Sequence, residues 1–205
     1  MIQVEYYFSL LSPWSYLGHY RFNKIAEKHN IKVIFKPIPM FDLFAETGGL
    51  PANKRHITRQ AYRIMELKRF RKKLAMPLTL KPAYWPYDAN LAHSIIFAMI
   101  DNDYNPMNFI QKSFVACWSH EKNMAQEATI IEILEAIELD RTLIAEAKKI
   151  NIATRHEENF KDAIAANVFG APSYVWKDEV FWGQDRVEFL DEALSEGREA
   201  YNSQI

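Results

Sequence analysis

The sequence predicts an α/β protein in which a β-α-β segment and a β-β-α segment frame a long, all-helical insertion. Runs rich in Val, Ile and aromatic residues, which favour strands, lie near both ends of the 205-residue chain. Between them, apolar residues recur at the spacing of helices. We therefore expect one domain built from residues 1–38 plus 167–205 and a helical insertion domain at residues 39–166.

The N-terminal segment predicts a strand at residues 2–8, a helix at 13–29 and a second strand at 31–36. Pro37 and Pro39 end the second strand, because proline lacks the backbone N–H and fixes φ. Two strands joined by a helix within so short a span indicate a βαβ unit, so we expect these strands to pair in parallel.

Ser12 and Pro13 predict the beginning of the first helix, with Ser12 as the N-cap and Pro13 at the first helical position. A helix N-terminus has free N–H groups and roughly half a positive charge, so it favours a bound anion. Ser15 adds a second hydroxyl three residues later. The motif alone is equally consistent with Ser12 serving only as a cap.

The insertion predicts a series of helices, broken by a connector that contains Pro77, Pro82 and Pro86. Thr154 and Glu157 have the spacing of a capping box, in which each side chain accepts a hydrogen bond from the other's backbone N–H, and they predict a helix start. The predicted helices of this region lie at residues 55–74, 89–100, 106–117, 126–137, 140–149 and 154–167.

The C-terminal segment predicts strands at residues 173–176 and 180–182, followed by a final amphipathic helix. Residues 177–179 separate the strands, so a hairpin is expected, although no glycine there supplies the positive φ that tight hairpin turns need. The residues expected to face inward from the last helix are Val187, Leu190, Ala193 and Leu194.

Charge and hydropathy argue against several classes of partner. The net charge is −1 at pH 7, whereas proteins that bind nucleic acid or membrane surfaces usually carry a strong basic excess. The basic run at residues 68–73 is therefore expected to be a solvated helix face. No apolar run approaches the ~20 residues that span a bilayer, and no basic leader precedes an apolar segment. We expect a soluble cytoplasmic protein with no nucleic-acid or membrane partner.

Cys117 is the one cysteine of the chain, so an internal disulfide is excluded. Its neighbours in the sequence are apolar, and no basic partner is evident that would lower the thiol pKa. We therefore predict a buried, unreactive thiol. The six histidines lack the paired spacing of metal ligands on a helix, so we predict no metal site.

Three motifs carry a resemblance to a known family. They are SPWSYLG at residues 12–18, FGAPS at 169–173 and FWGQDR at 181–186. In this order and at this spacing they resemble the 2-hydroxychromene-2-carboxylate isomerases, which belong with the kappa-class glutathione transferases in the DsbA-like branch of the thioredoxin fold. The resemblance covers essentially the whole chain and implies a thioredoxin-like fold with a large all-helical insertion.

The resemblance also implies a glutathione-binding cleft between the first helix and a proline loop. Pro172 would form a cis peptide bond, and Ala171 would pair its backbone with the cysteinyl part of glutathione. Gln184 and Asp185 would hold the γ-glutamyl end, with Asp185 accepting from its α-ammonium group. Ser12 would donate a hydrogen bond to the glutathione sulfur and lower the thiol pKa, assisted by the helix dipole.

The same resemblance assigns Asn53, Lys54 and Tyr84 to the side of the organic substrate. Arg59 lies where relatives often have Lys, and would bind a glutathione carboxylate. Ala45 stands in place of a lysine that many relatives direct at the substrate carboxylate. The resemblance therefore leaves the identity of the second substrate open.

Redox members of this fold have Cys where this chain has Ser12 and Ser15, and hydroxyl groups cannot exchange disulfides. No motif of a serine hydrolase surrounds Ser12. The resemblance implies a homodimeric, glutathione-dependent isomerase of aromatic compound degradation, in which Ser12 stabilises the glutathione thiolate for reversible conjugate addition to an aromatic substrate. The alternatives are a kappa-type glutathione transferase or peroxidase and a non-catalytic peptide-binding module.

Overall fold

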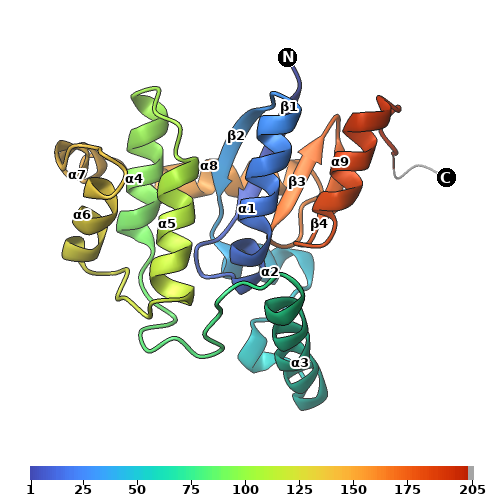
Figure 1. The fold of residues 1–205 in the computed structure, drawn as a ribbon, viewed down its shortest axis with the longest axis horizontal. Coiled ribbons are helices and arrows are strands. Elements are labelled where there is room, and N and C mark those ends of the chain that lie inside the picture. Colours follow the sequence, from blue (N-terminus) through green and yellow to red (C-terminus); the bar gives the residue numbers. More distant parts are fainter. Residues whose placement is uncertain (203–205) are drawn as a thin grey trace. The chain divides into compact units, whose positions relative to one another are not determined.

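A four-stranded mixed sheet is formed by the N- and C-terminal segments in the computed structural model, which describes residues 1–202 (Figure 1). The strands are β1 (Gln3–Phe8), β2 (Lys32–Pro37), β3 (Ser173–Trp176) and β4 (Glu179–Trp182). Their order is β2-β1-β3-β4, with β1 and β2 parallel and the other two pairs antiparallel. The predicted α/β frame, with its parallel pair and its C-terminal hairpin, is confirmed.

Helices α1 (Pro13–Lys28) and α9 (Val187–Glu196) cover one face of this sheet (Figure 1). The Tyr6 ring of β1 stacks on the Tyr174 ring of β3 with 5.3 Å between centroids, and the Phe22 ring of α1 lies within 4.7 Å of both. All three side chains are fully buried. This aromatic cluster therefore fixes α1 to the two central strands.

Helices α2 (Met40–Thr47) and α8 (Ile152–Ala165) contribute to an apolar cluster on the opposite face. Tyr7 and Val175 point this way, because successive strand residues alternate between the two faces. Ala171 belongs to the same cluster, so the loop before β3 is anchored to it. The buried members are Tyr7, Ile38, Met40, Leu43, Ala163, Val168, Ala171 and Val175.

The turn between β3 and β4 forms without glycine. Lys177 and Asp178 adopt φ values of +49° and +66°. Positive φ at both central residues gives the backbone twist that matches a two-residue hairpin. β4 accordingly begins at Glu179, one residue earlier than the sequence predicted.

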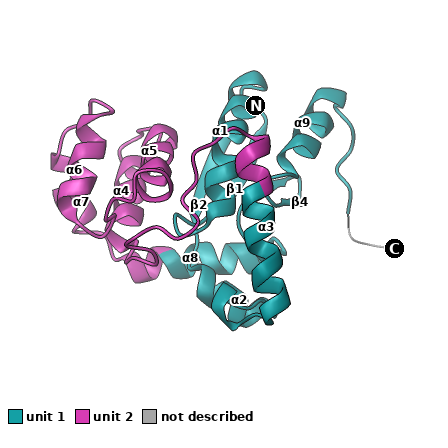
Figure 2. Cartoon of the chain, turned by 60° about the horizontal axis from the view of Figure 1, so that its bottom comes forward, with its two compact units in different colours: residues 1–68, 156–205 teal, residues 69–155 magenta. Residues whose placement is uncertain are grey.

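The chain divides into two compact units (Figure 2). Unit 1 contains residues 1–68 and 156–205 and includes the sheet, and unit 2 contains residues 69–155. The predicted insertion domain, residues 39–166, extends beyond unit 2 at both ends, and its boundaries stay a prediction. The other helices are η1 (Ala52–Lys54, a 3-10 turn), α3 (Ile57–Lys73), α4 (Asn90–Asp101), α5 (Met107–Trp118), α6 (Glu127–Glu135) and α7 (Thr142–Ala147).

The helices of unit 2 pack on one another through their apolar faces, α4 against α5 and α7, and α5 against α6. The helices predicted between residues 55 and 167 are present, and each begins and ends within two residues of the prediction. Asp140 precedes α7 as expected, and its Oδ1 accepts a hydrogen bond from the Thr142 N–H at 2.7 Å. Fully buried residues of this core include Ile95, Ile96, Phe109, Ile110, Phe114, Ile130 and Leu134.

The predicted capping box at Thr154 is wrong. Helix α8 begins at Ile152, and the Thr154 N–H donates to the Asn151 side chain at 3.3 Å. Glu157 instead pairs with Lys161 one turn further on, at 2.7 Å. Asn is as good an N-cap as Thr, and Asn151 takes this role three residues before the predicted cap.

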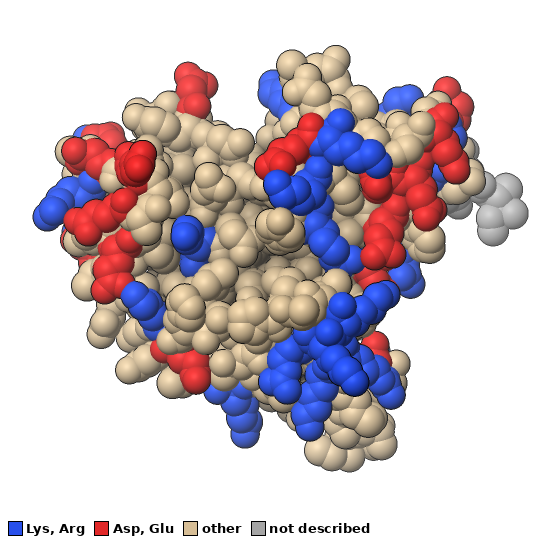
Figure 3. Space-filling model, viewed as in Figure 1, with Lys and Arg blue, Asp and Glu red and all other residues tan. Residues whose placement is uncertain are grey.

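Basic side chains gather over α3 (Figure 3). Only Leu67 of this helix is buried, and the lysines and arginines of residues 68–73 are exposed. The predicted solvated helix face is confirmed. Among residues 1–202, no helix is both long enough and apolar enough to cross a membrane.

Gly18→Ala is expected to destabilise the protein, because α1 closely approaches the turn before α9 at this position. A Cβ atom on Gly18 would lie 2.7 Å from the Tyr174 hydroxyl oxygen and 3.2 Å from the Gln184 Cα. Although alanine favours helices, we expect urea denaturation to show a loss of about 1–3 kcal/mol in the free energy of unfolding. Lys24→Ala, at an exposed position of α1, should leave the free energy of unfolding nearly unchanged. An equally small loss for Gly18→Ala would contradict this packing.

Candidate functional site

Ser12 caps helix α1 and is nearly buried, with 8% of its surface exposed. Its φ of −100° and ψ of 116° are extended, as an N-cap requires, and its Oγ accepts a hydrogen bond from the Ser15 N–H at 3.2 Å. The same Oγ donates to the Ala171 carbonyl oxygen at 3.3 Å. The predicted cap is confirmed, and its hydroxyl faces the loop before β3.

The Ser15 hydroxyl is occupied within the protein. Ser15 is fully buried, and its Oγ accepts a hydrogen bond from the Ser9 N–H at 3.5 Å. A hydroxyl without exposed surface is closed to a ligand. Of the two hydroxyls in the motif, Ser12 is therefore the candidate for chemistry.

The loop before β3 places backbone groups beside Ser12. The Ala171–Pro172 peptide bond is cis, as the resemblance implied. The Pro172 carbonyl accepts from the Gly183 N–H at 2.8 Å, which joins this loop to the turn before α9. Within the described chain, the Ala171 N–H donates no hydrogen bond. Since buried N–H groups are nearly always paired, this donor is a candidate contact for a ligand.

The turn before α9 supplies two more backbone donors. Gly183 has a φ of +111°, which favours glycine, and a Cβ there would lie 2.9 Å from the Asp185 carboxylate. In the part of the chain that the structure describes, the N–H groups of Gln184 and Asp185 donate to no acceptor. They precede α9, whose positive N-terminal end adds to their attraction for an anion.

The side chains of this turn differ in accessibility. Asp185 is 45% exposed at its side chain, and its Oδ2 pairs with Arg186 at 2.7 Å. Gln184 is only 2% exposed, and its Oε1 accepts a hydrogen bond from Arg21. Asp185 can therefore face a ligand with its carboxylate, whereas Gln184 offers its backbone.

Sequence reasoning missed Arg21, which holds this turn. Arg21 donates to Gln184 and pairs with Glu188 at 3.0 Å. A single basic residue within a helix gives no signal of such a role. The available indication was Gly18, because a small residue at i−3 on the same helix face lets another segment approach.

The predicted residues Asn53, Lys54 and Arg59 are exposed on η1 and the first turn of α3. Asn53 accepts a hydrogen bond from Gln60 through its backbone carbonyl at 3.3 Å. Among the residues that the structure describes, no contact joins any of the three to Ser12, so their roles toward a ligand stay predictions.

Tyr84 and Ala45 belong to different units. Tyr84 lies in unit 2 with 53% of its surface exposed, after Ala83, whose N–H donates to Glu121 at 3.1 Å. Ala45 is exposed on α2 in unit 1 and adds no charge there. The role predicted for Tyr84 stays a prediction.

Trp182 lies at the surface rather than in the core, with 51% of its surface exposed. Its ring is 4.7 Å from that of Phe169, which is 43% exposed. Gly170 allows the close approach, since a Cβ there would lie 2.5 Å from the indole nitrogen. Two exposed aromatic rings thus flank the loop that contains Ala171.

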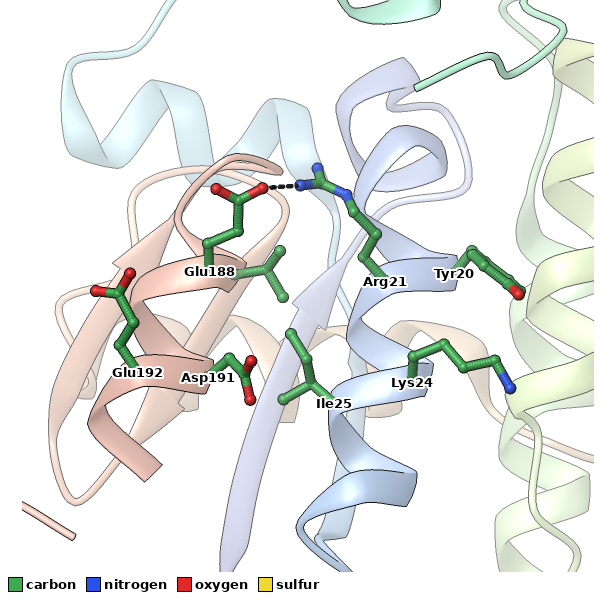
Figure 4. Close-up of a pocket in the computed structure, with 8 residues that line it drawn as sticks. Tyr20, Arg21, Lys24, Ile25, Glu188, Asp191 and Glu192 are labelled. Carbon is green, nitrogen blue, oxygen red and sulfur yellow. Dashed lines mark hydrogen bonds and ion pairs between the residues drawn. The ribbon is translucent and has the colours of Figure 1, made fainter. Parts of the chain in front are cut away.

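A groove of about 460 Å³ lies between α1 and α9 (Figure 4). Its walls carry both acidic and basic side chains, and the ion pair of Arg21 with Glu188 crosses one end. Neither Ser12 nor Ala171 lines it, so we do not place the chemistry there. The lining residues are Tyr20, Arg21, Lys24, Ile25, Val187, Glu188, Asp191 and Glu192.

Cys117 is buried in α5, with 1% of its surface exposed. Burial raises the pKa of its thiol to about 12. The predicted buried thiol is confirmed. Over residues 1–202, no group of three or more His, Cys, Asp and Glu side chains is placed to hold a metal ion.

The sheet order and a helix N-terminus that faces a cis-proline loop together define a protein of the thioredoxin fold. The chain belongs to the family described as the DSBA-like thioredoxin domain, whose model matches residues 3–195.

Relatives within this fold support the resemblance found in the motifs. The chain is 26% identical to a 2-hydroxychromene-2-carboxylate isomerase of Pseudomonas putida over 93% of each protein. A solved 2-hydroxychromene-2-carboxylate isomerase superposes with a TM-score of 0.80 at 24% identity, covering 95% of both chains. Glutathione S-transferase kappa 1 of Caenorhabditis elegans is 21% identical, over 95% of this chain and 91% of that protein.

The Cys117 thiol is expected to resist modification in the folded protein. Since its pKa is raised to about 12, the reactive thiolate is scarce at about pH 8. A chromogenic disulfide reagent should therefore detect almost no thiol in native protein and one per chain in denaturant. Rapid labelling of the native protein would contradict the burial of this residue.

Proposed function

We propose that this protein is a glutathione-dependent enzyme of the 2-hydroxychromene-2-carboxylate isomerase type, in which Ser12 holds the glutathione sulfur as a thiolate. The observation that carries the proposal is the hydrogen bond from Ser12 to the Ala171 carbonyl. It sets a hydroxyl at a helix N-terminus beside the loop of Ala171 and Pro172, whose Ala171 N–H lacks a described acceptor. The isomerase and kappa-transferase names of the relatives favour a glutathione-related reaction.

The groups around Ser12 fit the chemistry of glutathione. Its cysteinyl part offers a carbonyl to the Ala171 N–H, as an added strand would. Its γ-glutamyl end has a carboxylate, which suits the N–H groups of Gln184 and Asp185, and an ammonium group, which suits the Asp185 carboxylate. These N–H groups have no acceptor in the described chain. Arg59, an exposed cation, is the proposed partner of the remaining carboxylate.

Ser12 would act through its hydroxyl proton. The bond to the Ala171 carbonyl is long at 3.3 Å, so the hydroxyl can rotate and donate to a sulfur instead. The Ser15 N–H keeps the Ser12 oxygen in place during that rotation. Donation to the sulfur and the dipole of α1 both favour its charged form and so lower the thiol pKa. Bound glutathione would supply a nucleophile for reversible conjugate addition to an aromatic substrate.

The organic substrate is proposed to be aromatic and to contact Asn53, Lys54 and Tyr84. Lys54 is an exposed cation suited to a carboxylate, and the other two side chains can form hydrogen bonds with a phenol. Ala45 provides no positive charge for a substrate carboxylate, so aromatic substrates other than the chromene should be tested as well. We further propose that the protein is a homodimer, that it acts in the cytoplasm and that it takes part in aromatic compound degradation. Light scattering tests the oligomeric state.

A kappa-type glutathione transferase or peroxidase is the second candidate. The similarity to glutathione S-transferase kappa 1 over 95% of the chain favours it. It uses the same thiolate at Ser12, but the thiol leaves as an adduct or in oxidised form. The two candidates therefore differ in whether glutathione is consumed.

Ser12→Ala is expected to raise the pKa of the bound glutathione thiol toward the ordinary thiol value of about 8.5. In the wild type the lowered pKa keeps the thiolate populated at lower pH, so activity should begin to rise at lower pH than in the variant. We expect kcat/KM to fall about 10²–10³-fold. Thiolate absorbance of the complex against pH measures the shift directly.

Ser15→Ala is the matched control for this test, since its hydroxyl is buried one turn away. It should leave the thiol pKa of bound glutathione unchanged. Removing the Ser12 cap should also lower the free energy of unfolding by about 1 kcal/mol. Thermal unfolding of both variants measures this loss of stability separately from the thiol pKa. If wild type and Ser12→Ala give the same titration curve, the proposed role of Ser12 is wrong.

A turnover screen separates the candidate reactions. Chromene carboxylate, an aryl halide and a hydroperoxide should each be supplied with and without glutathione. We expect chromene carboxylate, or a related aromatic substrate, to turn over only with glutathione and without consuming it. Consumption of the thiol would indicate the kappa-type reactions. Binding of glutathione without turnover of any substrate would instead support a non-catalytic peptide-binding module.

A further inference from the structure

Arg21 reaches from α1 to the turn before α9 and on to α9 itself (Figure 4). One guanidinium nitrogen donates to both the backbone carbonyl and the side-chain Oε1 of Gln184. The other terminal nitrogen pairs with Glu188 at 3.0 Å. The Arg21 side chain is only 22% exposed, so these contacts are partly shielded from water. Arg21 therefore holds Gln184 by its backbone and its side chain at once.

The bond to the Gln184 carbonyl fixes the direction of the next N–H. The peptide between Gln184 and Asp185 is trans, and in a trans peptide the C=O and N–H point to opposite sides. Because Arg21 holds the carbonyl toward α1, the Asp185 N–H points away from Arg21. That N–H donates to no acceptor among the described residues.

The turn has little room to adopt another orientation. Gln184 is 2% exposed, and its Cα lies so close to Gly18 that a Cβ there would be 3.2 Å away. The Tyr174 hydroxyl lies against the same glycine, at 2.7 Å from that Cβ position. Close packing at Gly18 and the hydrogen bonds of Arg21 thus constrain one residue from two sides.

We propose that Arg21 is the positioning residue for the γ-glutamyl end of glutathione, an inference that rests on the proposed function. Arg21 does not touch the ligand. It directs the Asp185 N–H toward the α-carboxylate and keeps the Asp185 carboxylate in place for the α-ammonium. One terminal nitrogen of the guanidinium donates to Gln184 while the other pairs with Glu188, an arrangement that the single ammonium group of a lysine cannot reproduce. The exposed Glu188 partner contributes little to this direction.

The test compares two thiol peptides that differ in the group concerned. Dissociation constants for glutathione and for cysteinylglycine, which lacks the γ-glutamyl residue, are measured by calorimetry on the wild type, Arg21→Met, Arg21→Lys and Glu188→Gln. In Arg21→Met we expect the constant for glutathione to rise about tenfold or more. The constant for cysteinylglycine should stay within about twofold, because its contacts are separate.

Three further readings complete the test. The thiol pKa at saturating glutathione should not change in Arg21→Met, since Ser12 is intact. Glu188→Gln, which keeps both bonds to Gln184, should bind both peptides within about twofold of wild type. Arg21→Lys should show the same selective loss to a smaller degree, and it carries the test if Arg21→Met does not fold.

The outcomes separate this inference from the proposed function. Equal weakening of both peptides, or no weakening of glutathione, in the Arg21 variants overturns the positioning role alone. A wild-type protein that binds neither peptide overturns the proposed function, and the positioning role falls with it. A selective loss of glutathione binding supports both.

Discussion

The hydrogen bond between the Ser12 hydroxyl and the Ala171 carbonyl joins two segments that lie 159 residues apart in the chain. Each end is anchored separately. Ser12 begins the helix that Phe22 fixes to the sheet, and Ala171 belongs to the apolar cluster on the other face. A serine cap or a proline before a strand is common on its own. Here a hydroxyl donor, a helix N-terminus and an N–H without an acceptor among residues 1–202 are brought together, and this convergence defines the candidate site.

Strand β1 makes that convergence a consequence of topology. Helix α1 follows the end of β1, and the Ala171 loop precedes the start of β3. Because β1 and β3 are antiparallel neighbours, with Tyr7 opposite Ser173, the C-terminal end of β1 and the N-terminal end of β3 lie side by side. β4 then returns antiparallel, with Trp182 opposite Ser173, and leads the turn before α9 to the same end of the sheet. The strand pairing therefore brings together two segments that lie 159 residues apart in the chain.

Sequence patterns predicted the features that depend on neighbouring residues. Ser12 could be identified as a cap because capping involves the next turn only. Thr154 was expected to cap α8, but its N–H donates to Asn151, which caps the helix three residues earlier. Gln184 was expected to hold a ligand, and its side chain is buried against Arg21, a contact across 163 residues. A contact between residues so far apart leaves no periodic pattern in the sequence. The turn could therefore be predicted from the sequence, but the arginine that holds it could not.

Serine at both redox positions changes where a reactive sulfur can come from. With cysteines there, the protein supplies the sulfur and exchanges disulfides. Ser15 is fully buried, so its hydroxyl is closed to a ligand. Cys117 is the one thiol of the chain, and its pKa of about 12 keeps it protonated. Sulfur chemistry at Ser12 therefore requires a ligand that brings its own thiol. The helix dipole that would stabilise a thiolate of the protein would then stabilise a thiolate of the ligand. A hydroxyl group suits this role as a hydrogen-bond donor, because it cannot itself form a disulfide.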